Sequence, residues 1–526
     1  MIDVSLLPVA LGGLALTVGV ERLLVPRPAL RRPADCWMLH AGLWCVGLGL
    51  LYALTARPLF SGVNLLLLWL LIVLVSNSKY HSLREPFVCA DFEYFSDAVK
   101  FPRLYLPFFG FGKAALLAVG FLVYLWAGLS FEVPGARLAA LLPLAVGLGL
   151  LRLGRRQVQP SFDAERDVRA WGLAASLWRY FWAARAPVDR AGLGSPFAGE
   201  PVPASSPAKA AAASGFGQPT SLPDLVSVQS ESFFDVRDLW PGVRPQVLDQ
   251  YDLLASQALA RGKLQVAAWG ANTVRTEFAY LTGIPTGRLG VHRFNPYRVL
   301  ARQGLPSIAS TLKAQGYRTV CIHPYDGGFY GRNKVLPALG FDEFIDVKAF
   351  DASQKAGPFI GDCAVAEKIR ELLQAPGRTQ PLFIHAVTME NHGPLHLESA
   401  AAHELPAWFD RPLQPGMQDL GPYVRHICNA DRMLGMLRET LMARPNEALL
   451  CFYGDHVPIL PGVYQAIGAP AGDTDYLIWS NRHQPGCRAS ALAVQQLSST
   501  LLGHASTHAQ APAQGRHAPA ASAGVA

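Results

Sequence analysis

Charged side chains are scarce in this sequence. Asp, Glu, Lys and Arg make up 16% of its 526 residues, whereas 51% of the residues are hydrophobic. A soluble protein of this length carries more charge, because its surface has to face water. The shortage of charge therefore excludes a wholly soluble protein and predicts a membrane part joined to a globular part.

Motifs that recognise DNA or RNA are absent, although the formal net charge is +7. Much of the positive charge lies beside apolar segments, at residues such as Arg22, Arg27, Arg152 and Arg155. Arginines in such places usually lie at a membrane face. We therefore expect no nucleic-acid partner.

Polar faces are missing from the first 155 residues, where repeated apolar runs have the length of a membrane span, roughly 17 to 25 residues. One such run could be the core helix of a soluble protein, but several in succession leave no face for water. The first run also lacks a basic segment ahead of it, which argues against a cleaved signal peptide. We predict a transmembrane domain over residues 1–155 with five spans, at residues 4–24, 37–55, 59–76, 106–129 and 136–153.

Cysteine is rare too, with eight residues in the chain. Cys321 and Cys451 fall in apolar runs, and we expect them in the core. Cys363, Cys428 and Cys487 could include one disulfide if their domain lies outside the cytoplasm, but the sequence does not fix the pairing.

Two segments are rich in Ala, Ser and Pro and cannot bury enough apolar surface to fold. The pattern predicts a linker at residues 199–219 and a disordered tail at residues 504–526. Ahead of the linker, aromatic residues such as Trp178 favour an interfacial helix within residues 155–185, with a core helix of the next domain as the alternative. Residues 156–220 are thus interpreted as interfacial helix and linker.

Residues 221–503 alternate short apolar runs with helical patterns, which predicts an α/β domain with a mostly parallel sheet and helices on both faces. A helix is predicted to start near Ser307 and to stop at Gly316. Ligands of such sheets bind beyond the carboxyl ends of the strands. The predicted strands are residues 225–229, 319–323, 382–388, 448–453 and 476–479.

Carboxylates and imidazoles lie at or just after the carboxyl ends of four of these strands: Glu231, His323, His392, and Asp455 with His456. Asp, Glu and His together suit Mn²⁺, Mg²⁺ or Zn²⁺, and the lack of cysteine at these positions argues against a structural zinc cluster. Each residue alone could be a turn, a helix cap or half of a salt bridge. Their joint placement at one sheet edge favours a metal site.

A threonine lies where a helical pattern begins, in the stretch "WGANTVRTEFAYLTGIP". Free backbone N–H groups and the helix dipole near Thr273 would stabilise a phosphate oxygen, and a hydroxyl held by a metal becomes a nucleophile. The alternative is that Thr273 or Asn272 only caps the helix, and the spacing alone favours that alternative.

Six motifs in order make the sequence resemble the lipoteichoic acid synthase branch of the alkaline phosphatase and sulfatase superfamily. They are "SESFFD", "NTVRTEFAYLTG", "FYGRNKVLPALGFDEF", "ENHGP", "FYGDHVP" and "YLIWSN", within residues 224–481. The resemblance implies a catalytic Thr273 and one Mn²⁺ or Mg²⁺, with Zn²⁺ as a further option. The implied ligands are Glu231, Thr273, Asp455 and His456.

The resemblance also implies a substrate site. "FYGR" is similar to the family's aromatic-x-Arg motif, which places Tyr330 and Arg332 around a phosphoglycerol group, where an arginine can clamp phosphate through two hydrogen bonds. The family usually has tryptophan at the Tyr330 position, which leaves the head group open. His392 matches a histidine that binds or protonates the departing group. His323 is a further substrate-binding candidate, or else a strand-end histidine with its bonds satisfied.

Members of this family transfer glycerol phosphate from phosphatidylglycerol through a phospho-threonine and leave diacylglycerol. The resemblance thus implies a phospholipid donor and the membrane as partners. An Ala-, Arg-, Pro- and Gly-rich composition favours a Gram-negative bacterium, in which a periplasmic glucan or surface polysaccharide would be the acceptor. The alternatives are a phosphoethanolamine transferase or phosphodiester hydrolase of the same superfamily, and an inactive membrane scaffold. The EF-x-x-LTG motif favours phosphoglycerol, and retention of all four metal-site residues argues against the scaffold.

The distribution of Lys and Arg and the family resemblance predict opposite sides of the membrane for the catalytic domain. Lys and Arg counts place residues 22–35, residues 79–103 and the segment after Arg152 on the cytoplasmic side, which leaves the catalytic domain in the cytoplasm. The resemblance implies the opposite side, because the donor lies in the outer leaflet. We predict a multi-pass protein of the inner (plasma) membrane with a periplasmic or extracellular catalytic domain.

Overall fold

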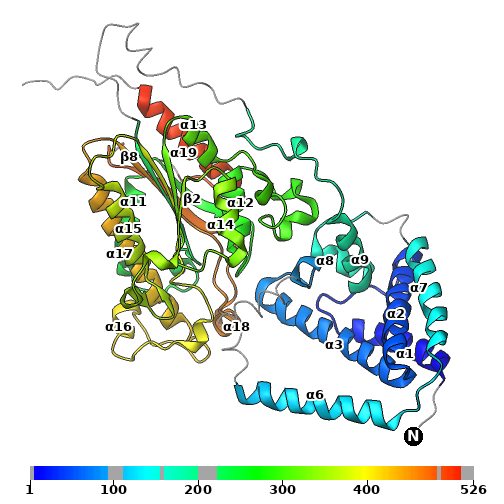
Figure 1. The fold of residues 1–526 in the computed structure, drawn as a ribbon. Helices are drawn as coiled ribbons and strands as arrows, with labels where there is room; N and C mark the ends of the chain where they lie inside the picture. The colour runs from blue at the N-terminus through cyan, green and yellow to red at the C-terminus, as the bar shows by residue number, and fades with distance from the viewer. Residues whose placement is uncertain are drawn as a thin grey trace, which may run out of the picture. The chain divides into compact units, whose positions relative to one another are not determined.

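The computed structural model describes residues 5–92, 111–154, 159–199, 222–482, 487 and 489–510 (Figure 1). The chain forms two compact units. The helical unit comprises Met1–Leu193 with two short segments, Trp269–Ala271 and Thr286–Val299. The sheet unit comprises Gly194–Ala268, Asn272–Pro285 and Leu300–Ala526.

The helical unit contains a helix in each of the five predicted apolar runs. Two of its helices, α2 and α3, are long and apolar enough to cross a membrane, by length and composition, within the described residues. Two of the five predicted spans are thus supported, and the other three stay predictions; α1 has 16 residues, and η3 precedes an α7 of 13 residues. Part of the fourth predicted run, residues 106–110, lies outside the described residues. The bounds are α1(Leu6–Glu21), α2(Ala34–Thr55), α3(Pro58–Leu83), α6(Phe111–Phe131), η3(Arg137–Ala140), α7(Leu141–Leu153), α8(Ala164–Trp171) and α9(Leu173–Ala183).

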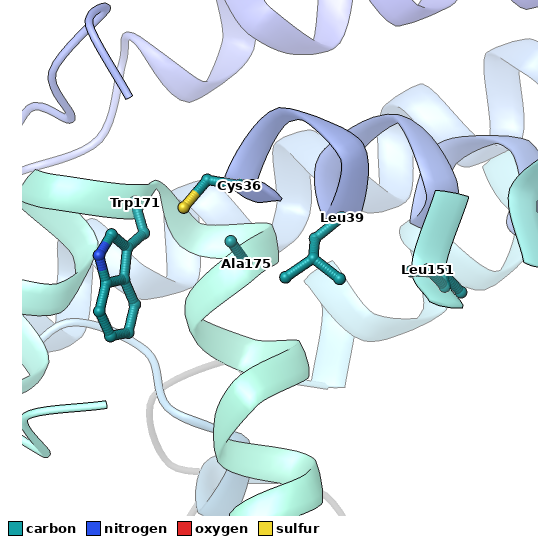
Figure 2. Close-up of a cluster of buried hydrophobic side chains, with 5 residues drawn as sticks. All are labelled: Cys36, Leu39, Leu151, Trp171 and Ala175. Atoms are coloured by element: carbon teal, nitrogen blue, oxygen red, sulfur yellow. The ribbon is translucent and has the colours of Figure 1, made fainter. Parts of the chain in front are cut away.

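Glycines allow α2 and α7 to pack closely. A Cβ atom on Gly42 would lie 3.1 Å from the carbonyl oxygen of Gly147, and one on Gly147 would lie 2.8 Å from the nitrogen of Val46. Small residues at such a crossing let two backbones approach each other. Figure 2 shows the neighbouring core, in which side chains of α2, α7, α8 and α9 meet. These side chains are Cys36, Leu39, Leu151, Trp171 and Ala175.

The predicted interfacial helix is in fact two helices, α8 and α9, which belong to the helical unit. Gly172 separates them with a positive φ of 85°, and a Cβ there would lie 2.1 Å from a guanidinium nitrogen of Arg32. The buried carboxylate of Glu21 pairs with Arg32 at 2.6 Å and accepts the backbone N–H of Leu173 at 2.9 Å. This contact ties the end of α1 to the start of α9.

The sheet unit is an α/β domain, as predicted. Its sheet has eight strands in the order β10-β2-β9-β8-β1-β7-β3-β4, and β9 is antiparallel to both of its neighbours. Figure 1 shows α11, α15 and α17 on one face of the sheet and α12, α13, α14 and α19 on the other. The strands are β1(Asp224–Ser230), β2(Ala260–Gln265), β3(Arg318–Ile322), β4(Glu343–Ile345), β7(Leu382–Val387), β8(Ala448–Gly454), β9(Thr474–Ser480) and β10(Leu492–Ala493). The α-helices described in this unit are α11(Asp249–Ser256), α12(Thr273–Thr282), α13(Ile308–Ala314), α14(Arg332–Ala338), α15(Asp362–Leu373), α16(Leu405–Trp408), α17(Leu420–Met442), α18(Pro461–Ile467) and α19(Val494–Gln510).

All five predicted strands are present, and α13 starts after Ser307, whose hydroxyl accepts the backbone N–H of Ser310. Three strands of the sheet were not predicted: β2, β4 and β10. Strand β2 has the sequence "ARGKLQ", which lacks an apolar run, and its antiparallel pairing with β9 holds it in the sheet.

The chain ends and cysteines differ in part from expectation. Helix α19 runs to Gln510, so the first residues of the predicted tail are helical; residues 511–526 and linker residues 200–219 lie outside the described residues.

All eight cysteines are described and all are free, which corrects the suggestion of a disulfide among Cys363, Cys428 and Cys487. Cys321 and Cys451 are buried in β3 and β8, as expected.

Candidate active site

Two acidic side chains meet where β1 and β8 end. These strands are parallel neighbours, with Ser230 beside Gly454, so the next residues of the two strands, Glu231 and Asp455, emerge together. Gly454 is needed at this point, because a Cβ atom there would lie 1.8 Å from the carbonyl oxygen of Phe233. The sequence thus places two carboxylates at one point of the sheet edge.

Glu231, Asp455 and His456 form a buried cluster. Each offers a ligand atom within 4.8 Å of the others, and their exposed fractions are 3%, 0% and 1%. Nε2 of His456 lies 3.3 Å from Oδ2 of Asp455 and 3.5 Å from Oε1 of Glu231. Oδ2 of Asp455 and Nε2 of His456 are buried without a hydrogen-bond partner in the described structure. Unpaired buried polar atoms are costly, and this set of oxygen and nitrogen donors fits a divalent cation.

The electrostatics of the cluster also favour a cation. Burial, and then the charge of Asp455, raise the pKa of Glu231 to about 7, against the weaker opposing effect of His456. Two carboxylates this close and this well buried repel each other unless a positive charge or a proton lies nearby. A divalent cation would supply that charge.

Three hydroxyl-bearing residues hold the cluster in place. The backbone N–H of Ser232 donates to Oδ1 of Asp455 at 2.8 Å, and its hydroxyl donates to Oε1 of Glu231 at 3.0 Å. The backbone N–H of Glu231 donates to the hydroxyl of Thr388 at 3.0 Å, and the hydroxyl of Thr276 donates to the carbonyl of Asp455 at 2.8 Å. Sequence analysis missed all three, although Thr388 follows β7 directly and the strand-end rule would have found it.

Thr273 lies beside this cluster. It is the first residue of α12, it is 8% exposed, and its hydroxyl donates to Oε2 of Glu231 at 3.4 Å. Asn272 occupies the N-cap position in the left-handed conformation, with a φ of 68°, and its side chain makes no capping hydrogen bond. The capping alternative therefore receives no support, and the Thr273 hydroxyl is directed to the acidic cluster.

Arg332 and His323 lie together, and the carboxylate of Glu277 joins them. Arg332 is 1% exposed, and its Nη2 donates to Oε2 of Glu277 at 2.7 Å while its Nε contacts both oxygens of that carboxylate. Its Nη1 donates to Nε2 of His323 at 3.1 Å, and Nδ1–H of His323 donates to the carbonyl of Val387 at 3.0 Å. Burial, and then the charge of Arg332, lower the pKa of His323 to about 3, so this ring is neutral. Glu277 thus occupies the Nε and Nη2 edge of the Arg332 guanidinium. A phosphate bound through two hydrogen bonds would need that edge.

The remaining predicted residues, Tyr330 in η10(Phe329–Gly331) and His392 in the turn after β7, lie in the sheet unit. Tyr330 has a positive φ of 55°, and its ring centroid lies 5.5 Å from the guanidinium carbon of Arg332. His392 donates from Nδ1 to the carbonyl of Gly393 at 2.7 Å, which leaves Nε2 as its acceptor nitrogen. Burial lowers the pKa of His392, so its neutral form predominates near pH 7.

Comparison with known proteins decides the family. A family model described as "Sulfatase" matches residues 223–507, which is more than half of the chain. The chain belongs to the sulfatase family. The eight strands of its sheet and the cluster at the ends of β1 and β8 lie within the matched region.

The relatives of this sulfatase-family chain include two proteins of Rhizobium meliloti. One, named for cyclic beta-1,2-glucan modification, is 30% identical over 300 residues, which cover 54% of this chain and 46% of that protein. The chain thus matches about half the length of this relative. The other is the capsular polysaccharide biosynthesis protein RkpI, 26% identical over 495 residues, which cover 88% of this chain and 85% of RkpI.

A solved structure shares the fold of both units. The integral membrane protein lipooligosaccharide phosphoethanolamine transferase A (EptA) from Neisseria meningitidis matches with a TM-score of 0.56 over 95% of each chain. The sequence identity is 14%, so the likeness concerns the fold. It shows an N-terminal helical region followed by a sulfatase-like α/β domain.

Proposed function

We propose that this sulfatase-family protein is a membrane-anchored enzyme that transfers a phosphoglycerol group from phosphatidylglycerol to a cell-envelope glycan through Thr273. The observation that carries the proposal is the Thr273 hydroxyl at the start of α12, hydrogen-bonded to Glu231 of the buried acidic cluster. A hydroxyl directed to such a cluster, beside the free N–H groups of a helix start, is placed for attack on phosphorus.

Glu231, Thr273, Asp455 and His456 are the residues that would hold one Mn²⁺ or Mg²⁺, with Zn²⁺ as a further option. When bound, the metal supplies positive charge that lowers the pKa of a hydroxyl and stabilises phosphate oxygens. The chain itself orients the nucleophile through α12 and excludes water by burying all four side chains. Ser232 holds the two carboxylates by hydrogen bonds, and Thr276 and Thr388 hold the backbone of Asp455 and of Glu231.

The chemistry has two steps in this proposal. Oγ1 of Thr273 gives its proton to Oε2 of Glu231, its hydrogen-bond partner, and forms a bond to phosphorus while the bond to the diacylglycerol oxygen breaks. The departing oxygen takes a proton from Nε2 of His392, which acts here in its protonated, minority form. The neutral His392 that remains accepts the proton of the glycan hydroxyl that attacks the phospho-threonine, and Glu231 returns its proton to Oγ1 as the bond from Oγ1 to phosphorus breaks. The hydrogen bond from Nδ1–H to Gly393 supports this role, because it keeps Nε2 as the nitrogen that exchanges the proton.

Several observations support phosphoglycerol and a glycan. The aromatic-x-Arg and EF-x-x-LTG motifs resemble those of phosphoglycerol transferases, and two relatives are named for glucan modification and capsular polysaccharide biosynthesis. In this assignment Tyr330 and His323 border the head group, and Arg332, whose Nε and Nη2 are held by Glu277, contacts phosphate through Nη1. Tyr330, where the family usually has tryptophan, leaves the head group open, and phosphoethanolamine transfer is the second candidate.

We assign the parts of the chain accordingly. Residues 1–155 anchor the protein in the inner (plasma) membrane, and residues 156–220 connect the anchor to the catalytic domain. The catalytic domain starts at residue 221 and includes α19 up to Gln510, which leaves residues 511–526 as the tail. The catalytic domain lies on the periplasmic or extracellular side, where the donor lipid of the outer leaflet and the glycan are available.

The test is a donor assay with the full-length protein in nanodiscs. Phosphatidylglycerol and phosphatidylethanolamine are supplied together with cyclic beta-1,2-glucan, and mass spectrometry follows diacylglycerol and the glycan. We expect phosphatidylglycerol to be consumed and the glycan to gain phosphoglycerol. Consumption of phosphatidylethanolamine alone would establish the second candidate, and consumption of neither lipid would contradict both.

A further inference from the structure

The helical unit contains an apolar cavity that the proposed chemistry has not used. Its volume is about 810 Å³, and residues of α3, η1(Cys89–Asp91), α9 and η8(Gly290–Phe294) line it. Sites for small molecules typically measure about 300 to 1,000 Å³, so the cavity is large enough for a bound organic molecule. All of its lining residues belong to the helical unit.

One wall of the cavity is a face of α3, a candidate membrane span. Leu65, Leu68, Trp69 and Ile72 line it at positions i, i+3, i+4 and i+7, which share one side of a helix. Leu68 is 51% exposed, so this wall is open to the surroundings of the helix. Because a candidate span lies in hydrocarbon, a molecule that enters past this wall comes from the lipid layer.

The opposite walls add aromatic rings and positive charge. Trp178, Phe181 and Arg185 line the cavity from α9 and the residues that follow it, with the Arg185 guanidinium carbon 3.4 Å from the Phe181 ring centroid. Arg298 lines the cavity near η8. Long arginine side chains lay their apolar stems along such a wall and hold the charge at its polar end. Burial lowers the pKa of the neighbouring His292, so the positive charge comes from the two arginines.

The segment near η8 links this cavity to the reacting helix along the chain. Helix α12 begins at Thr273 and ends at Thr282, and the segment Thr286–Val299 follows after three residues, Gly283, Ile284 and Pro285. A molecule bound in the cavity thus touches the chain segment that leads directly out of the helix of the proposed nucleophile.

We propose that this cavity binds an anionic glycerophospholipid, with its acyl chains against α3 and α9 and its phosphate beside Arg185 and Arg298. An apolar cavity with a wall in the lipid layer and two arginines fits an amphiphile with two hydrocarbon chains and a negative head group. That the lipid is the donor rests on the proposed function; that the cavity holds a lipid rests on the cavity alone.

Photolabelling of the full-length protein in nanodiscs tests the proposal. The probe is a phosphatidylglycerol with a diazirine in one acyl chain, and labelled peptides are located by mass spectrometry. We expect labels on α3 and α9, and Leu68→Trp, which fills the cavity, should lower the labelling of α9 by about tenfold. The matched control is Leu71→Trp, since Leu71 lies on the same helix, is also 51% exposed and does not line the cavity. Equal labelling of α9 in the two variants would overturn the proposal, because the lipid would then be bulk bilayer; Leu177→Trp on α9 repeats the test if Leu68→Trp does not fold.

A second comparison tests the proposed contact between the lipid phosphate and the two arginines. Arg185→Gln combined with Arg298→Gln should lower labelling by phosphatidylglycerol and leave labelling by a diazirine diacylglycerol, which lacks phosphate, unchanged. Arg152→Gln, a charge removed from α7 away from the cavity, should change neither. Loss of both signals together in the double variant would contradict the assigned phosphate position.

Labelling needs no turnover, so Thr273→Ala should be labelled as the unmodified protein is. Cavity labelling without any lipid consumption by the unmodified protein would contradict the proposed function and support the lipid site. Lipid consumption without cavity labelling would contradict the lipid site and leave the proposed function standing.

Discussion

The hydroxyl of Thr273 lies 3.4 Å from Oε2 of Glu231, and 42 residues separate the two along the chain. Glu231 emerges from the end of β1 and Thr273 begins α12, so the contact joins a strand end to a helix start. Both residues are buried, and the cluster of Glu231 includes Asp455 and His456. This relationship places the Thr273 hydroxyl, the buried acidic cluster and the start of α12 at one point, as the proposed mechanism requires.

Metal binding should depend on Asp455. The substitution Asp455→Asn removes a negative charge while keeping the shape, so the purified variant should retain well under one metal ion per chain. Elemental analysis by mass spectrometry measures the content. Chelation of the unmodified protein should abolish turnover, and Mn²⁺ or Mg²⁺ should restore it. The control is Asp473→Asn at an exposed position, and full metal content in Asp455→Asn would refute the site.

Glu277 should contribute strongly to stability through Arg332. Glu277→Gln leaves a buried guanidinium without its carboxylate, which should cost about 3 to 5 kcal/mol of unfolding free energy. Glu343→Gln breaks a half-exposed pair with Arg318 and should cost at most about 1 kcal/mol. Denaturant unfolding of the two variants measures the difference. Equal losses of unfolding free energy in the two variants would show that the buried Glu277–Arg332 pair stabilises the protein no more than the half-exposed pair does.

The stability of the sheet unit should fall as pH rises through His426. Burial opposes the charged form of His426, but hydrogen bonds to Glu390 and Glu398 raise its pKa to about 9. A raised pKa gives stabilisation that is complete below the ordinary value, about 6.5, and is lost between there and about pH 9. The thermal midpoint should fall over this window more steeply in the unmodified protein than in His426→Gln. The exposed-site variant His403→Gln should keep the full slope, and a parallel slope in His426→Gln would contradict the assignment.

Reporter fusions test on which side of the membrane the catalytic domain lies. Alkaline phosphatase fused after Asn481 should be active, because we place the catalytic domain outside the cytoplasm, and a cytoplasmic reporter at the same site should be inactive. The reverse pattern would favour the topology that Lys and Arg counts indicate.

Strand ends were the most predictable part of the site. Apolar runs such as that of β1 mark buried strands locally, and Glu231, Asp455 and His456 follow them directly in sequence. Strand β2 escaped prediction because "ARGKLQ" has no such run and depends on its pairing with β9. The pair of Arg332 with Glu277 joins segments 55 residues apart, and no local pattern encodes such a contact. The bounds of the spans are harder to predict, because apolar length alone does not show where a helix starts, as at η3 before α7.

Thr273→Ala should separate chemistry from folding. Loss of one hydroxyl at a helix start costs about 1 kcal/mol, so the thermal midpoint should move by only a few degrees. Turnover should fall by orders of magnitude, because the attacking atom is gone. Thr282→Ala, which removes the same hydroxyl at the other end of α12, should keep its turnover.

Peptide mass spectrometry after incubation with phosphatidylglycerol in the absence of glycan tests the central claim most directly. The account predicts a glycerol-phosphate adduct on the peptide that contains Thr273, released when glycan is added and absent from Thr273→Ala. A Thr273→Ala protein that consumes the donor at the unmodified rate, or an adduct on a different residue, would contradict it.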